Sequence, residues 1–340
     1  MKFLIAGLGS IGRRHLKNLI ALGEEDIVLY RTGKSTLPDE ELKGFLTEYS
    51  LDDALGHEPD AVIISNPTAL HLDVAIPAAK RGCHLLIEKP ISHNMDRVDD
   101  LRDAVITAGV QVLVGFQFRY HPGLRAIKNW IDSEVIGAPT SALSYWGEYL
   151  PDWHPWEDFQ RSYSARGDLG GGVVLTLCHP FDYLRWLFGE VEWVYGSVDQ
   201  RGPWDLAVED LADAMMRFEG GMRCSVHLDY LQRPPEHTLK IIGTEGTITW
   251  DNTDGVAKCY QAEVKEWHVA QPPADFERND LFLNEMKHFL EVLGSGVPAL
   301  PDLNDGVEIL RIVSAIKESS KAGERISLFP SDLDPANSLE

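Results

Sequence analysis

Three glycines near the start of the chain have the spacing of a phosphate-binding turn. Gly7, Gly9 and Gly12 form a G-x-G-x-x-G pattern after a short apolar run and ahead of a segment with helical spacing. Glycines allow a tight turn and close backbone approach, and a helix N-terminus offers unpaired N–H groups and a positive dipole to an anion. The pattern predicts that this turn, with Ser10 and Ile11, binds a dinucleotide pyrophosphate; the alternative is an ordinary glycine-rich turn.

A basic residue directly follows the second strand expected in the sequence, residues 27–30. NAD-preferring sites place an acidic residue at this point, where it binds the adenosine ribose hydroxyls. This chain instead has Arg31, followed by Thr32, Lys34 and Ser35. Cations and hydroxyls suit a 2′-phosphate, so NADP is favoured over NAD as the cofactor. In the alternative, Arg31 stacks on adenine or faces solvent.

Two further residues have the chemistry of acid–base catalysts. Lys89 follows the expected strand 84–87, and the carboxyl ends of parallel strands are where doubly wound sheets bind ligands. His179 precedes a helical pattern, and an imidazole titrating near neutral pH suits proton transfer. The alternatives are a solvated loop lysine and a structural histidine.

The first 120 residues have the pattern of a parallel sheet that positions these groups. Short apolar runs alternate with helical patterns, which is typical of crossover units. We expect strands at residues 3–6, 27–30, 61–65, 84–87 and 111–114, and helix starts at Ser50 and Thr68. The fold class is therefore α/β, with an N-terminal doubly wound parallel sheet.

Beyond residue 120 the pattern changes to longer runs with strand periodicity and hairpin signals at residues 219–221 and 244–246. We expect strands at 140–149, 191–199, 211–218, 222–230, 237–242 and 247–250, with helices at 122–133, 178–187, 280–293 and 306–322. This predicts a C-terminal α+β domain with an open, mostly antiparallel sheet. The expected division is 1–120, 121–325 and a polar tail, 326–340.

Composition limits the partners. The 53 acidic against 31 basic side chains give a net charge of −22, which disfavours binding to nucleic acid or to an anionic membrane. No apolar stretch is long enough for a membrane span, and no secretory signal is expected. The four cysteines form no C-x-x-C pair, so no metal site is expected and a cytoplasmic location is favoured.

A series of short motifs in one order resembles the glucose-fructose oxidoreductase, inositol dehydrogenase and rhizopine-catabolism family, Gfo/Idh/MocA. The series is the glycine turn, Ser65-Asn66-Pro67 with His71, Glu88-Lys89-Pro90, residues 115–122 with Gln117 and Arg119, and the triplet 170–172 leading to His179. The resemblance covers residues 1 to about 325. It implies a Rossmann domain and a substrate-binding and oligomerisation domain.

The resemblance also implies roles for individual residues. Lys89 would assist proton transfer at the substrate carbon and the nicotinamide. The cofactor would be lined by Ser65, Asn66, Pro67, His71, Glu88 and Gln117, and the substrate by Arg119, Tyr120, Thr176 and His179.

The sequence departs from the family at one catalytic position. The usual aspartate ahead of the histidine is replaced by Thr176, and the spacing from the glycine triplet to His179 is one residue shorter than usual. We expect His179 to act with Lys89 without that carboxylate. Asp182, three residues along the same helix, is the alternative partner, but we expect it to be committed elsewhere.

Aromatic and cationic residues gather between Tyr149 and Arg166, a composition suited to stacking on sugar faces and to hydrogen bonding hydroxyls. The candidates are Trp153, His154, Trp156, Tyr163 and Arg166. A packed loop is the alternative, and Arg161 with Arg166 hints at an acidic substrate.

The sequence as a whole predicts an NAD(P)-dependent oxidoreductase that transfers hydride between the nicotinamide and a carbinol carbon of a sugar-like substrate. The alternatives are a non-catalytic cofactor-binding sensor or scaffold, and a glycosidase that uses tightly bound NAD for transient oxidation. The antiparallel sheet lacks enough helices to cover both faces, so we expect a homodimer or homotetramer.

Overall fold

The computed structural model describes residues 1–33, 37–153, 155 and 157–329. It divides into two compact units. The first consists of residues 1–117, 168–171 and 277–310, and the second of the described parts of 118–167, 172–276 and 311–329. The sequence predicted divisions at residues 120 and 325, whereas two later segments, 168–171 and 277–310, join the first unit.

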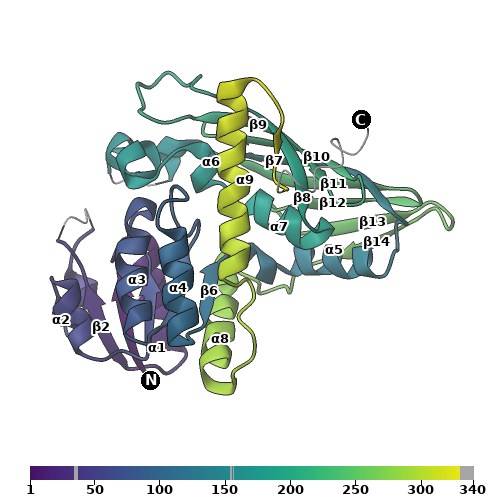
Figure 1. Ribbon diagram of the computed structural model, residues 1–340. Helices are drawn as coiled ribbons and strands as arrows, with labels where there is room; N and C mark the ends of the chain where they lie inside the picture. The colour runs from purple at the N-terminus through teal and green to yellow at the C-terminus, as the bar shows by residue number, and fades with distance from the viewer. Residues whose placement is uncertain (34–36, 154, 156, 330–340) are drawn as a thin grey trace. The chain divides into compact units, whose positions relative to one another are not determined.

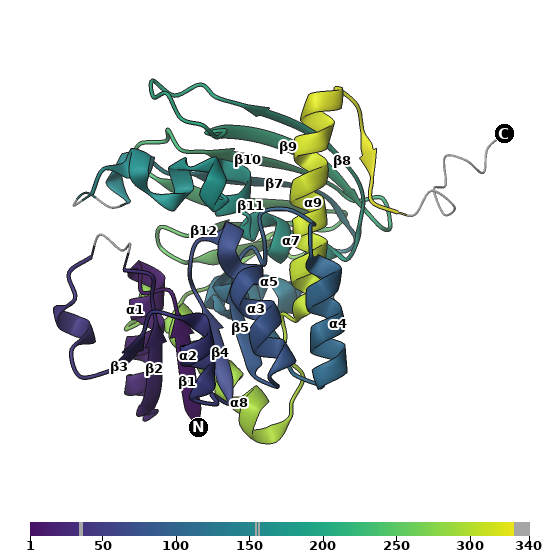
Figure 2. The same cartoon turned by 60° about the vertical axis from the view of Figure 1, so that its left-hand side comes forward.

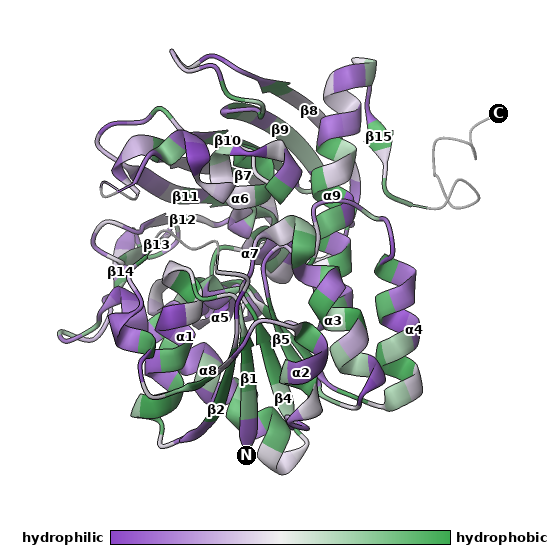
Figure 3. Ribbon diagram, turned by 90° about the vertical axis from the view of Figure 1, so that its left-hand side faces the viewer, coloured by the Kyte–Doolittle hydropathy of each residue, from purple (hydrophilic) through white to green (hydrophobic). Residues whose placement is uncertain are grey.

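Six described strands of the first unit form a parallel sheet in the order β3-β2-β1-β4-β5-β6, which confirms the doubly wound fold (Figure 1). The strands are β1 Lys2–Ala6, β2 Asp26–Tyr30, β3 Leu46–Glu48, β4 Ala61–Ile64, β5 His84–Glu88 and β6 Val112–Gly115. The three-residue strand β3 was not predicted. Strands β1, β4 and β5 are strongly hydrophobic (Figure 3), as expected for a sheet buried on both faces.

The helices of this sheet are α1 Ser10–Ala21, α2 Leu51–Gly56, α3 His71–Lys80 and α4 Val98–Ala108. Helices α3 and α4 lie side by side in the views of Figures 1 and 2. The expected start at Ser50 is confirmed, because its Oγ accepts the Asp53 N–H at 3.4 Å. At Thr68 the chain first makes a short 3₁₀ turn, Thr68–Leu70, and α3 begins at His71.

Helix α8, Arg278–Ser295, belongs to the first unit although it lies far along the chain. Its Met286, Phe289 and Val292 join one buried cluster with Leu16 and Leu19 of α1. The amide of Asn279 also donates to Asn18 Oδ1 at 2.9 Å. The apolar face of α1 therefore requires a helix from the end of the sequence to cover it.

The second unit contains a nine-stranded sheet in the order β14-β13-β12-β11-β7-β10-β9-β8-β15. The only parallel pair among its described strands is β7 with β10, so the expected mostly antiparallel sheet is confirmed. The strands are β7 Pro139–Gly147, β8 Val191–Asp199, β9 Leu211–Phe218, β10 Arg223–Asp229, β11 Glu236–Gly243, β12 Gly246–Asp251, β13 Ala257–Gln261, β14 Glu266–Ala270 and β15 Ile326–Ser327. The last three were not predicted.

Helices of the second unit are α5 Pro122–Asp132, α6 Val173–Thr176 and α7 His179–Phe188, together with α9, Leu303–Ala322, from Arg311 onward. Ser319 Oγ of α9 accepts the Gly196 N–H at 2.9 Å, and a Cβ at Gly196 would meet the Ile316 carbonyl oxygen at 2.7 Å. The helix therefore lies directly against β8. Within the described part of the chain, no helix combines the length and apolar character needed to cross a membrane.

Candidate functional site

Two of the three glycines of the first turn are required by the chain itself. A Cβ on Gly7, whose φ is +97°, would lie 2.4 Å from the Asn66 nitrogen, and one on Gly12 would lie 1.9 Å from the Gly7 carbonyl oxygen. Ser65 Oγ donates to that same carbonyl at 2.9 Å. The turn is thus held tightly against the end of β4.

No atom of the described chain requires a glycine at position 9. Its backbone (φ −72°, ψ −166°) suits any residue, and a Cβ there would meet no atom of the described chain within 4 Å. Gly9 is also the N-cap of α1, where no side chain caps the helix and no acidic residue lies in the first turn. The open side of the turn therefore fits an anion such as a pyrophosphate, bound by the N–H groups at the helix start.

Two amide side chains lie where β4 and β6 end. Asn66 Nδ2 donates to the Leu70 carbonyl at 2.9 Å, whereas Asn66 Oδ1 and Gln117 Oε1 are buried without a hydrogen-bond partner among the described residues. Buried acceptors of this kind are costly unless a donor reaches them. Both predicted cofactor residues are thus poised to accept hydrogen bonds from a ligand.

His71 links two segments of the site. Its ring nitrogens lie 3.0 Å from the Pro90 carbonyl oxygen and 2.9 Å from the Asn66 carbonyl oxygen. Burial lowers the pKa of His71, whereas its two carbonyl neighbours raise it in part. His71 thus lies between Asn66 and the loop after β5, and its neutral form can donate to one of the two carbonyls.

The carboxylate of Glu88 anchors the end of β5, just before Lys89. Glu88 Oε1 lies 2.8 Å from His15 Nε2, and Oε2 accepts the Lys89 backbone N–H at 3.3 Å. Burial opposes ionisation, but the hydrogen bond with His15 and the charges nearby together outweigh it and lower the pKa of Glu88. Lys89 is partly exposed, and its peptide bond to Pro90 is cis.

The basic residue at the end of β2 is already paired. Arg31 is 9% exposed, and its Nη1 lies 2.6 Å from Asp39 Oδ1; Arg13 Nη2 lies 3.8 Å from the same oxygen. Thr32 is exposed, and Lys34 and Ser35 lie outside the described residues. A 2′-phosphate at this position would compete with Asp39, a residue that the sequence reasoning missed because it is eight positions from Arg31.

In the second unit, His179 begins helix α7 and is 2% exposed. Its ring packs edge-on against Phe118, with the centroids 5.0 Å apart, and near Trp146 at 5.7 Å. The structure places Thr176 three residues before it, where its hydroxyl is near Tyr230. His179 therefore sits in an aromatic environment that limits its contact with water.

Asp182 engages a different predicted residue. Its carboxylate is fully buried and accepts two hydrogen bonds from Arg119, Nη2 at 2.6 Å and Nε at 3.0 Å. A bidentate pair of this kind fixes both side chains. The guanidinium that the sequence reasoning assigned to the substrate thus orients the helix that carries His179.

Two further histidines lie buried close to His179, and no local sequence signal marked them. His237 stacks on Trp146, with ring centroids 4.2 Å apart, and its Nε2 lies 3.2 Å from the Tyr183 hydroxyl. His121 packs edge-on against Trp250 at 5.1 Å. Burial lowers the pKa of His121 to about 4 and that of His237 well below its usual range. Both rings are neutral at neutral pH.

The aromatic segment after β7 is packed in part. Trp153 contacts Tyr230 edge-on at 5.5 Å, while its buried Nε1 has no hydrogen-bond partner among the described residues. Tyr163 and Arg166 are exposed, and Tyr120 is buried. His154 and Trp156 lie outside the described residues. Trp153 therefore offers a hydrogen-bond donor that nothing described in the chain uses.

Comparisons with known proteins identify both units. A family model described as "Oxidoreductase family, NAD-binding Rossmann fold" matches residues 1–116. A second model, "GFO/IDH/MocA C-terminal domain", matches residues 124–249.

Individual relatives align along nearly the whole chain. The chain is 26% identical over 338 residues to D-xylose 1-dehydrogenase (NADP(+)) 2 of Haloferax volcanii, covering 96% of this chain and 100% of that protein. It is 27% identical over 354 residues to myo-inositol 2-dehydrogenase of Thermotoga maritima, covering 96% and 98%. A solved levoglucosan dehydrogenase in complex with NADH and levoglucosan has the same fold, with a TM-score of 0.86 at 21% identity over 97% of this chain and 100% of that one.

Proposed function

Because the chain belongs to the Gfo/Idh/MocA family of oxidoreductases, we propose that it is a nicotinamide-dependent dehydrogenase or reductase acting on a CH–OH group of a sugar or polyol. The observation that carries the proposal is Gly9, which faces open space at an uncapped helix start. The names of the relatives, a xylose, an inositol and a levoglucosan dehydrogenase, support a sugar-like substrate.

The cofactor residues of the proposed reaction are those of the first unit. Backbone N–H groups at Ser10, Ile11 and Gly12 would bind the pyrophosphate, and the amides of Asn66 and Gln117 would hydrogen-bond the rest of the dinucleotide. When bound, the nicotinamide would accept or donate the hydride.

Proton transfer is the contribution of the chain's own side chains. During oxidation of the alcohol, Lys89 as a neutral amine would accept the hydroxyl proton, and as an ammonium it would return it in the reverse direction. His179 is the second proposed acid–base residue, with Arg119 and Asp182 fixing its helix. Tyr120, Trp153, Tyr163, Arg166 and Thr176 are the proposed substrate residues.

For the cofactor, we propose NADP in preference to NAD. The support is the buried cation Arg31, with Arg13 beside it, at the end of β2. Asp39 is 60% exposed, so its ion pair with Arg31 is of the kind that contributes about 1 kcal/mol or less. A 2′-phosphate, with its higher charge, can replace that carboxylate.

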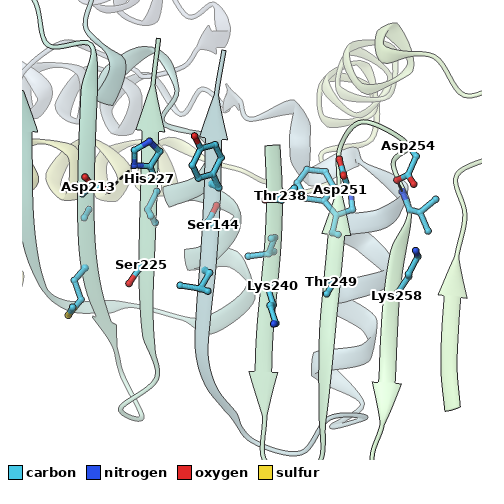
Figure 4. A pocket seen from close by; sticks show the side chains of 18 of the residues that line it. Ser144, Asp213, Ser225, His227, Thr238, Lys240, Thr249, Asp251, Asp254 and Lys258 are labelled. Atoms are coloured by element: carbon cyan, nitrogen blue, oxygen red, sulfur yellow. Dashed lines mark hydrogen bonds and ion pairs between the residues drawn. The ribbon is translucent and has the colours of Figure 1, made fainter. Parts of the chain in front are cut away.

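The outer face of the second sheet supports a homo-oligomer. The strand register aligns two rows across this face. One row runs Tyr195, Met215, Ser225, Leu143, Lys240, Thr249 and Lys258, and the other runs Ser197, Asp213, His227, Tyr145, Thr238 and Asp251. They line a hollow of about 880 Å³ (Figure 4). Tyr195, Met215 and Leu143 of the first row are 46%, 45% and 60% exposed, with Ser225 between the last two. Exposed apolar side chains of this kind are buried when a sheet packs on another sheet.

Both signs of charge lie on the same face. Lys240 of β11 and Lys258 of β13 flank β12, which carries Asp251, and Asp213 of β9 is bonded to His227 at 2.8 Å (Figure 4). The support for a second copy is therefore the exposed apolar side chains of this face. We also propose a cytoplasmic location. All four cysteines are buried free thiols, which suits a reducing compartment.

Gly9→Ala tests the dinucleotide site. The added methyl group meets no atom of the described chain, so the melting temperature should stay within about a degree while the Kd for NAD(P)H rises at least roughly tenfold, since the methyl occupies the path of the pyrophosphate. Gly56→Ala, which also faces open space, is the matched control. Unchanged NAD(P)H affinity in Gly9→Ala, measured by fluorescence titration, would place the dinucleotide elsewhere.

Lys89→Ala tests the chemistry. Turnover of xylose, myo-inositol or levoglucosan should fall roughly a hundredfold or more, as expected for loss of an acid–base group, while NAD(P)H affinity and melting temperature stay nearly unchanged. The exposed Lys80→Ala is the control. If Lys89→Ala has a raised KM and a normal kcat, Lys89 is a substrate-positioning residue. If the wild type is inactive on all the sugars and polyols tested, a sensor or scaffold is favoured.

Arg31→Asp and Asp39→Asn test cofactor choice in opposite directions. Wild type should bind NADPH more tightly than NADH. Asp39→Asn should increase that preference by roughly three- to fivefold, because the competing carboxylate is lost, and Arg31→Asp should reverse it. Fluorescence titrations of both cofactors measure the ratio. Equal or tighter binding of NADH by wild type contradicts the proposal.

Leu143→Glu tests the assembly. Light scattering of the wild type should give a dimer or a larger particle, and a charge at Leu143, on the central strand β7, should shift it toward monomer at micromolar concentration. Ile106→Glu, at a 76% exposed position of α4, is the control. A wild type that is already monomeric refutes the interface.

A further inference from the structure

Three buried side chains of the first unit bring two carboxyl groups and an imidazole together. They are His15 of α1, Glu88 at the end of β5 and Glu285 of α8, and their nitrogen and oxygen atoms lie within 4.8 Å of one another. His15 and Glu285 are 0% exposed and Glu88 is 8% exposed. Two carboxyl groups this close and this dry cannot both hold a negative charge without a proton or a cation between them.

The two carboxyl groups differ in their partners. Glu88 lies 2.8 Å from His15 Nε2 and accepts the Lys89 N–H, whereas neither carboxyl oxygen of Glu285 has a hydrogen-bond partner among the described residues. An ionised Glu285 would therefore be an unpaired buried charge beside another of the same sign. A protonated Glu285 would instead be neutral and would carry one O–H donor, and a carboxylate oxygen of Glu88, which can accept, lies within 4.8 Å.

We infer that Glu285 is a carboxylic acid that shares its proton with Glu88 and thereby fixes the strand end that presents Lys89. Burial, together with the charge of Glu88, raises the pKa of Glu285 well above its usual range, in agreement with the geometry. Glu285 is a positioning residue on this account, and its effect on turnover rests on the function proposed for Lys89.

A shared proton explains the cluster better than a metal ion. A histidine that binds a metal usually donates its other ring nitrogen to a second group, yet His15 Nδ1 has no hydrogen-bond partner among the described residues. His15 Nε2 is already engaged by Glu88. The Arg14 guanidinium also lies 4.4 Å from the centre of the Phe282 ring, beside the cluster, and repels a further cation.

Other charged groups set the pH range in which the proton is held. His71 and Lys89 act on Glu88, and Arg278 acts on Arg14 from α8. In the unfolded chain a glutamate loses its proton near pH 4.3. Because the folded pKa of Glu285 is raised, this group makes the free energy of unfolding fall as pH rises from about 4.3 toward that folded pKa.

Glu285→Gln is the informative variant, because a neutral amide keeps a hydrogen-bond donor and cannot ionise. Infrared spectra at pH 7 should show a carboxylic acid C=O band in wild type that is lost in Glu285→Gln and kept in the exposed control Glu291→Gln. The free energy of urea unfolding should fall between pH 5 and 8 in wild type and in Glu291→Gln. The part of this fall that comes from Glu285 should be absent in Glu285→Gln. Absence of the acid band in wild type overturns the inference.

Glu285→Leu, which leaves Glu88 without the donor, separates positioning from folding. Its kcat should fall roughly ten- to hundredfold with KM for substrate little changed, and Glu285→Gln should restore most of that loss. Equal losses of kcat in Glu285→Leu and Glu285→Gln contradict a positioning role for the proton. If Zn²⁺ raises the melting temperature of wild type but not that of Glu285→Gln, the cluster is a metal site. If wild type turns over no sugar or polyol, the proposed function fails, while the infrared and unfolding measurements still decide the protonation of Glu285.

Discussion

The close approach between the Gly7–Gly12 turn and the end of β4 is the constraint on which the first unit depends. A Cβ at Gly7 or Gly12 would overlap backbone atoms, so the turn fixes where α1 begins and which face of it looks inward. That face carries His15, Leu16 and Leu19. His15 then anchors Glu88, and Glu88 anchors the backbone of Lys89. The close packing of the first turn therefore fixes the position of His15, and through the hydrogen bonds of Glu88 it also fixes the backbone of Lys89, the residue proposed for proton transfer.

Elements with strong local periodicity were predictable from the sequence. Strands β8 and β9 begin and end at the expected residues, because alternation over eight or nine positions and clear turns leave one register. Strand β3 is three residues long, too short for any period to emerge. Strand β14 is exposed along most of its length, so it lacks the apolar alternation that marks a half-buried strand. The place of α8 in the first unit depends on long-range packing that no local pattern encodes.

The position in the fold of the proposed cofactor residues was easier to predict than the surroundings of the other proposed residues. The glycine spacing and the residues after β4 and β5 are local motifs, and their geometry follows from the strands that carry them. The Asp39 carboxylate beside Arg31, the Arg119–Asp182 pair and the stacking of His237 on Trp146 join residues from different elements. Arg31, Arg119, Asp182 and His237 are buried polar side chains, and tertiary structure decides which partner each of them meets.

The position of α8 also has a consequence for how this chain can be divided or recombined. A gene fragment ending at residue 117 would encode all six strands of the first sheet but not Glu285, Met286, Phe289 or Val292. The translated fragment would expose the apolar face of α1 to water and leave Glu88 without its neighbouring acid. Residues 1–117 alone are thus not an independent unit. A chimera that joins this unit to another substrate domain would also have to include residues 277–310.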